Sequence, residues 1–75
     1  MYSIQNNCPY PVMICYNRQP RYQLEPHHGR QRVECAPGIE ISATRNGEPE
    51  QPIRYQNQPL LIVINENGRP FILAQ

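Results

Sequence analysis

The chain has 75 residues, of which 39% are hydrophobic, and a formal net charge of +1. This size and composition predict one small folded domain spanning residues 1–75. The near-neutral charge excludes a general nucleic-acid or membrane-surface binder, and no stretch approaches the roughly 20 apolar residues of a membrane span. Nine prolines disfavour long helices, because proline lacks an amide hydrogen and clashes with the preceding helical turn.

Two short strands are expected at the start of the chain, over residues 2–5 and 10–16. Pro9 and Pro11 precede or open the second strand. Because proline cannot donate a hydrogen bond to a strand ladder, this strand is expected to begin at an edge, a bulge or a strand end.

A faint internal repeat links this region to the C-terminus. Asn17 and Pro20 recur 50 residues later (67 − 17 = 50) as Asn67 and Pro70. The repeat predicts two similar β-ribbons on opposite sides of one core.

Residues 21–35 are interpreted as a hairpin that turns through residues 26–29. The expected cross-strand pairs are Glu25 with Arg30, Gln23 with Arg32 and Arg21 with Glu34, and the expected inward side chains are Tyr22, Leu24, Val33 and Cys35. Opposite charges would then face each other across the strands. This interpretation gives three of the seven arginines an ordinary surface role in place of a ligand site.

The middle of the chain predicts a turn and two further strands. Pro37 and Gly38 suit the two central positions of a tight turn, since proline presets φ and glycine accepts a positive φ. Residues 39–44 alternate apolar and polar side chains, as a half-buried strand does. A polar loop is expected over residues 46–51, before a short strand at 53–55.

The strongest local pattern is a C-terminal hairpin. Asn67-Gly68 lies between two apolar runs, and both residues tolerate the positive φ of a two-residue hairpin turn. Pairing Glu66 with Arg69 fixes the register: Ile64 faces Phe71 and Ile62 faces Leu73 on one side, with Val63–Ile72 and Leu61–Ala74 on the other. Both faces are apolar, so the hairpin is either covered on both sides or meets another chain through one face. With these elements the chain predicts a small antiparallel β-sandwich of seven or eight short strands and no significant helix.

The three cysteines leave the redox state open. Cys8 and Cys15 are seven residues apart (15 − 8 = 7) on an extended run, which is too far for them to bond each other. An internal disulfide would therefore join Cys35 to one of them. The alternative is three reduced thiols, with Cys15 and Cys35 acting as small core residues.

The sequence contains few patterns typical of catalytic or metal-binding sites, and the chain is interpreted as a non-enzyme without cofactor or metal. It contains no Asp for a Ser-His-Asp triad. His27 and His28 occupy an expected turn, where catalytic geometry is hard to hold, and two imidazoles alone make an incomplete metal site. Tyr and Arg are favoured at interfaces, so the binding candidates are Arg18, Tyr22, His27 and His28.

Residues 4–12, with the sequence Ile-Gln-Asn-Asn-Cys-Pro-Tyr-Pro-Val, resemble the opening strand of thaumatin-like proteins. The chain resembles still better the small fungal family named for the Blastomyces yeast-phase-specific protein, with its Leu-x-Pro segment at 24–26, its Gly-Ile-x-Ile-Ser strand at 38–42 and its Asn-x-x-Gly-x-Pro-Phe element at 65–71. The resemblance implies a thaumatin-like β-sandwich and secretion, and it carries over no catalytic residue. The chain contains no Trp, and the acidic residues of the thaumatin cleft have no identified counterpart.

The first functional expectation is a secreted, extracellular, effector-type domain that binds a protein or carbohydrate surface. The alternative is a cytoplasmic small inhibitor or ligand-sequestering protein of phage or bacterial origin. That protein would hold an anion with paired arginines and dimerise through the C-terminal hairpin, residues 60–75.

Overall fold

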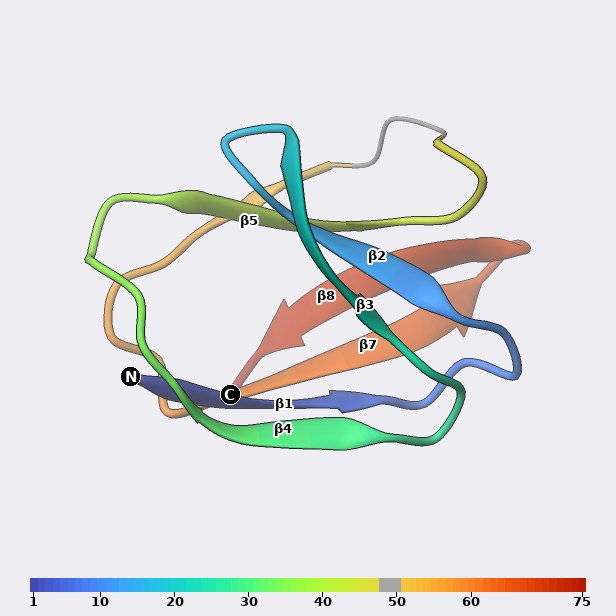
Figure 1. The fold of residues 1–75 in the computed structure, drawn as a ribbon, viewed down its shortest axis with the longest axis horizontal. Helices are drawn as coiled ribbons and strands as arrows, with labels where there is room; N and C mark the ends of the chain where they lie inside the picture. Colours follow the sequence, from blue (N-terminus) through green and yellow to red (C-terminus); the bar gives the residue numbers. More distant parts are fainter. Residues whose placement is uncertain (48–50) are drawn as a thin grey trace.

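The computed structural model describes residues 1–47 and 51–75, which form eight strands in two four-stranded sheets (Figure 1). The strands are β1 (Tyr2–Asn6), β2 (Val12–Tyr16), β3 (Gln19–Leu24), β4 (Gly29–Val33), β5 (Glu40–Thr44), β6 (Ile53–Arg54), β7 (Leu60–Glu66) and β8 (Arg69–Ala74). The described residues contain no helix, so the predicted small all-β sandwich is confirmed. In particular, this part of the chain has no helix long and apolar enough to cross a membrane.

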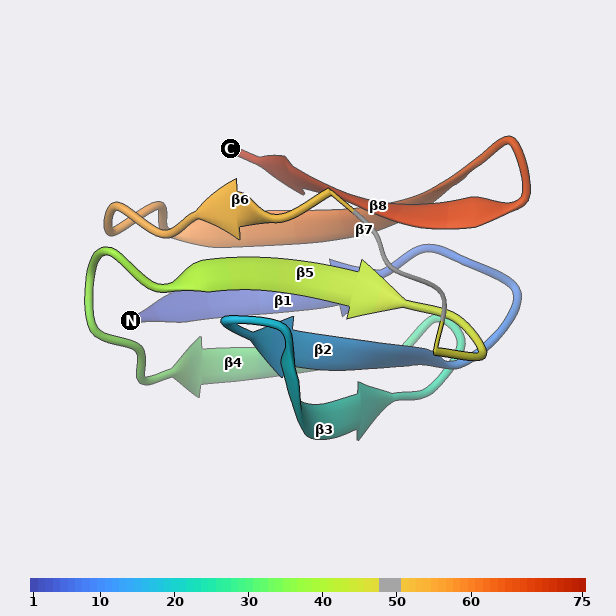
Figure 2. The same cartoon turned by 90° about the horizontal axis from the view of Figure 1, so that it is seen from above.

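The two sheets have the strand orders β4-β1-β7-β8 and β3-β2-β5-β6. All neighbouring strands are antiparallel except β1 and β7, which run parallel. Because β1 and β7 come from opposite ends of the chain, this parallel pair ties the N-terminal strand to the C-terminal hairpin in the middle of one sheet (Figure 2).

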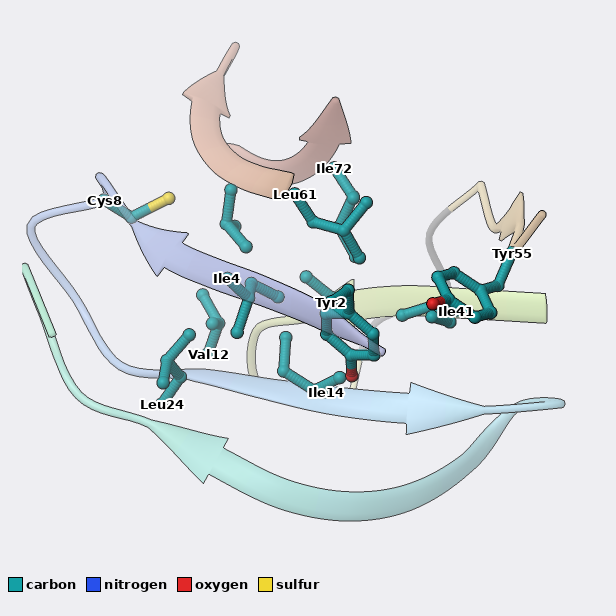
Figure 3. Close-up of a cluster of buried hydrophobic side chains, with 12 residues drawn as sticks. Tyr2, Ile4, Cys8, Val12, Ile14, Leu24, Ile41, Tyr55, Leu61 and Ile72 are labelled. Atoms are coloured by element: carbon teal, nitrogen blue, oxygen red, sulfur yellow. The ribbon is translucent and has the colours of Figure 1, made fainter. Parts of the chain in front are cut away.

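The core lies between the sheets, and alternation along the strands places it there. In β1, Tyr2, Ile4 and Asn6 point inward and are buried, while the residues between them are half-buried on the outer side. The apolar core consists of Tyr2, Ile4, Cys8, Val12, Ile14, Leu24, Ile41, Ala43, Tyr55, Leu61, Val63 and Ile72 (Figure 3). Every strand except β4 and β6 contributes at least one of these residues.

The C-terminal hairpin forms in the predicted register. Strands β7 and β8 pair from Glu66 opposite Arg69 to Leu61 opposite Ala74. Asn67 and Gly68 both have positive φ, at 52° and 77°, as a two-residue turn between twisted strands requires.

The faint repeat is confirmed as two similar hairpins in opposite sheets. Strands β2 and β3 form a hairpin in one sheet, and β7 and β8 form the other hairpin in the second sheet. The first turn is Asn17-Arg18, with φ of 51° and 66°, so Arg18 occupies the position that Gly68 holds in the second turn.

The predicted hairpin over residues 21–35 is wrong. Strand β3 pairs with β2, whereas β4 pairs with β1 in the other sheet, so the 25–28 segment crosses between the sheets. The Asn17-Arg18 turn instead pairs β3 with β2, the strand directly before it in the chain. Gly29 lies so close to β1 that a side chain there would come within 2.7 Å of the Ile4 carbonyl oxygen. The expected pairs of Glu25 with Arg30 and Arg21 with Glu34 are therefore not strand neighbours.

Other predictions are close to the observed strands. The second strand begins at Val12, directly after the two prolines, and the strand predicted at 39–44 begins at Glu40. Gly38 has a φ of 93°, as the predicted Pro37-Gly38 turn requires. The central part of the predicted 46–51 loop, residues 48–50, lies outside the described residues.

Candidate functional site

Asn6 anchors the segment between β1 and β2. Its side chain is fully buried, and its Nδ2 donates to the carbonyl oxygens of Tyr10, Leu24 and Glu25, each at 3.1 Å. Its Oδ1 accepts the Cys8 backbone N–H at 2.9 Å. One amide therefore satisfies backbone groups from the 7–11 loop and from the crossing between β3 and β4. Sequence reasoning missed this role, although the Asn-x-Cys-x-Tyr stretch contains two of its four partners, Cys8 and Tyr10.

A tyrosine cluster closes one end of the core. The Tyr2 hydroxyl lies 2.6 Å from the Tyr16 hydroxyl and 2.9 Å from the Tyr22 hydroxyl, which joins strands of both sheets. The rings of Tyr2 and Tyr55 have centroids 5.5 Å apart, and the Met1 amine donates to the Tyr55 hydroxyl at 2.6 Å. Burial raises the pKa of Tyr22 to about 12 and holds that of Tyr2 far above its ordinary value.

Three arginines stack on tyrosine rings at the surface. The guanidinium carbons lie 4.0 to 5.1 Å from the ring centroids, and the pairs are Arg21 on Tyr16, Arg30 on Tyr22 and Arg45 on Tyr10. An exposed pair of this kind contributes about 0.5–1 kcal/mol. Arg21 and Arg30, which the sequence suggested as cross-strand ion-pair partners, lie over tyrosine rings instead, as does Arg45.

The three cysteines are free thiols in the structure. Cys8 belongs to the core, whereas Cys15 is buried within β2 and Cys35 is half-buried after β4. Burial raises the pKa of both the Cys8 and the Cys35 thiols. A raised thiol pKa lowers the thiolate fraction at neutral pH, so neither side chain has the activation that a nucleophilic cysteine needs.

The predicted binding residues do not form one surface. Arg18 is exposed in the turn before β3, while His27 and His28 are exposed in the segment after it, so the length of a strand separates them (Figure 1). Tyr22 lies between, half-buried, with its hydroxyl bonded to Tyr2. The backbone at the two histidines is held by β1, since the Gln5 side chain donates to the His27 carbonyl at 2.9 Å.

Hollows on the surface are shallow and open to solvent. One of them, about 430 Å³, is lined by Met1, Glu34, Cys35 and Ala36. Another is lined by Tyr16, Asn17, Gln19, Arg21 and Ile39. Within residues 1–47 and 51–75, no cluster of three or more His, Cys, Asp or Glu side chains could hold a metal ion. These hollows offer no convergent set of catalytic groups.

The outer side of the C-terminal hairpin carries five large apolar side chains. We call it the hairpin face; it consists of Leu60, Ile62, Ile64, Phe71 and Leu73. Leu73 is 42% exposed and the other four are half-buried, and none of the five packs against the core cluster. The other side of the same hairpin, with Leu61, Val63 and Ile72, is buried in the core. The described residues therefore cover the hairpin on one side only, and the contact of its other face with another chain stays a prediction.

Polar groups border the hairpin face along β1. The parallel pairing puts Ser3 beside Leu60 and Gln5 beside Ile62. The Ser3 hydroxyl donates to the Gln31 side chain at 3.2 Å, and Gln5 is held by the His27 carbonyl. An apolar centre with a hydrogen-bonded polar rim is typical of protein–protein interfaces.

No family model, curated protein or solved structure matches this chain.

Proposed function

We propose that this protein is a non-catalytic binding domain that recognises a partner protein through the hairpin face. The observation that carries the proposal is a contiguous set of large apolar side chains left outside the core, with a polar rim along one side. Apolar patches with a polar rim mark interaction sites on protein surfaces.

The chemistry of the hairpin face favours a protein partner over a carbohydrate. Four of its five side chains are aliphatic and one, Phe71, is aromatic. Sugars need polar groups that replace their hydration, because an unpaired hydroxyl is costly to bury. The tyrosines, which could offer such groups, are buried or half-buried, and three of them lie under arginines. The proposal holds equally for an extracellular effector and for a cytoplasmic protein, because an apolar face works in either compartment.

The proposal is tested by crosslinking and then by binding to the purified partner. A photo-crosslinking amino acid replaces Phe71, and the matched control places it at Met13, a half-buried residue of β2 in the other sheet. A protein captured only from position 71 is purified and titrated with the wild type, Ile64→Glu and Met13→Glu. We expect Ile64→Glu to weaken binding by about tenfold or more, since a charge would be buried at the interface, while Met13→Glu leaves it unchanged. Equal binding by the wild type and Ile64→Glu would show that the hairpin face is not the binding surface.

A further inference from the structure

Strand β8 differs from the other three sheet edges in having a regular run of six residues, Arg69–Ala74. Edge β4 contains a bulge opposite β1, where Arg32 has a φ of 54°. Edge β3 has a register shift against β2, and edge β6 has two residues. Bulges and short strands protect an edge from pairing with another chain. Among the described strands, β8 is thus the edge best suited to receive a further strand.

The hydrogen bonds of the hairpin show which groups of β8 face outward. The Gln75 N–H donates to the Leu60 carbonyl at 2.9 Å, so odd-numbered residues of β8 point their backbone groups toward β7. Since strand residues alternate, Pro70, Ile72 and Ala74 direct theirs to the free edge. Pro70 has no N–H, so this edge offers two donors and three acceptors. Figure 2 shows β8 as the outermost strand of its sheet, with no described strand beyond it.

We infer that β8 pairs with β8 of a second copy, antiparallel about a two-fold axis at Ile72, to form a homodimer with a continuous eight-stranded sheet. In this register Ile72 exchanges two hydrogen bonds with its own counterpart. Each Ala74 N–H donates to the Pro70 carbonyl of the other copy, which adds two more. On the outer side, Phe71 of each copy lies opposite Leu73 of the other, a directly opposed apolar pair.

Side-chain pairing selects this register over its neighbours. Moving the second strand by two residues in one direction would place Phe71 opposite Gln75, and in the other direction Leu73 opposite Arg69. Each shift also places Leu73 or Phe71 opposite its own counterpart, so it replaces two apolar pairs with one apolar pair and two apolar–polar pairs. Within each copy, Ile62 already lies opposite Leu73 and Ile64 opposite Phe71. The register centred on Ile72 therefore continues each of these apolar pairs into the matching pair of the other copy.

The pattern favours a second copy over a different strand because it is self-complementary, as an isologous two-fold interface must be. A chain of 75 residues with three free thiols also gains stability from a partner subunit, which small domains use in place of crosslinks. The dimer does not depend on the proposed function. It places the two hairpin faces side by side and so enlarges the surface on which a partner protein would bind.

The test compares Ala74→Pro with Ala74→Val by sedimentation velocity and equilibrium over a wide concentration range. Ala74 is exposed, and proline there removes an edge N–H that β7 does not use. We expect a dimer for the wild type and for Ala74→Val, and a dissociation constant about tenfold or more higher for Ala74→Pro. Circular dichroism checks that both variants are folded. A wild type that remains monomeric at millimolar concentration, or an unchanged dissociation constant for Ala74→Pro, would overturn the inference.

Amide hydrogen exchange tests the register itself. The Ile72 N–H should gain protection as the protein concentration rises, whereas the Phe71 N–H, already directed toward β7, should not change. A dimer without this gain at Ile72 would show that the copies stack through their hairpin faces, and the edge pairing would be wrong. The Ile64→Glu variant distinguishes a failure of the edge pairing from a failure of the proposed function. Ile64 lies in β7, one strand away from the paired edge, so the substitution acts on the hairpin face and leaves the edge itself unchanged.

Discussion

At the scale of single residues, the Asn6 side chain joins the 7–11 loop to the crossing between β3 and β4. It is fully buried and supplies two N–H groups to three carbonyl oxygens from two segments, one at Tyr10 and the other at Leu24 and Glu25. A carboxylate of the same shape would turn an acceptor with negative charge toward those carbonyls. We therefore expect Asn6→Asp to lower the free energy of unfolding by about 3 kcal/mol or more at neutral pH, measured by urea denaturation.

The neighbouring asparagine provides the control. Asn7 is exposed, so Asn7→Asp adds the same charge at a site where water solvates it, and its effect should stay within about 0.5 kcal/mol. Equal losses in the two variants would mean that added charge, rather than the Asn6 hydrogen bonds, determines the effect.

At the scale of elements, the turn between β2 and β3 contains strain that the turn between β7 and β8 avoids. Arg18 has a φ of 66°, in the region where a side chain costs about 1–2 kcal/mol, whereas the equivalent residue of the second hairpin is Gly68. Arg18→Gly should raise the free energy of unfolding by about 0.5–1 kcal/mol, after the greater freedom of glycine in the unfolded chain is subtracted. Thermal and urea denaturation measure the change.

Arg18→Ala separates backbone strain from charge. Alanine removes the guanidinium but keeps a Cβ at positive φ, so this variant should show no gain. If alanine stabilises the protein as much as glycine does, the cause is charge, and the strain argument fails. If only Arg18→Gly raises the free energy of unfolding, the arginine in this turn has a role other than stabilising the fold.

The two hairpins also show what local sequence could and could not predict. Asn67-Gly68 between apolar runs determines its own turn and register, because all the information lies within a dozen residues. The predicted hairpin over residues 21–35 was wrong although its cross-strand pairs were plausible. The Asn17-Arg18 turn pairs β3 with β2, and this turn lacks the glycine of the usual Asn-Gly hairpin signal. The energy of local charge pairing was too small to determine which sheet each strand joins.

The candidate binding surface was likewise predictable only where its signal is local in the sequence. The hairpin face could be read from alternation in residues 60–74, and the sequence left open only whether its second face was covered. The predicted binding residues Arg18, His27 and His28 were chosen by residue type, and residue type contains no information on distance across the fold. The parallel pairing of β1 with β7, which gives the face its polar rim, joins opposite ends of the chain and has no local signal.

At the scale of the whole molecule, the tyrosine cluster makes stability depend on alkaline pH. Tyr2 and Tyr22 come from different sheets, and burial raises the pKa of both, to about 12 for Tyr22. In the unfolded chain these hydroxyls ionise near pH 10. Their contribution is therefore fully present below pH 10 and is lost as the pH rises from 10 toward 12, because the unfolded state then releases protons that the folded state keeps.

We expect the free energy of unfolding to begin to fall at about pH 8.5, where the Cys8 and Cys35 thiols ionise in the unfolded chain, and to fall more steeply above about pH 10, by up to about 1.4 kcal/mol per pH unit for each raised tyrosine. Urea denaturation at a series of pH values measures this curve, and ultraviolet difference absorbance follows tyrosine ionisation in the same samples. Tyr22→Phe removes one of the raised groups and leaves Tyr2 its bond to Tyr16, so its curve should fall less steeply. If all five tyrosines ionise near pH 10 while the protein stays folded and equally stable, the hydroxyls are open to water, and the cluster does not seal the end of the core.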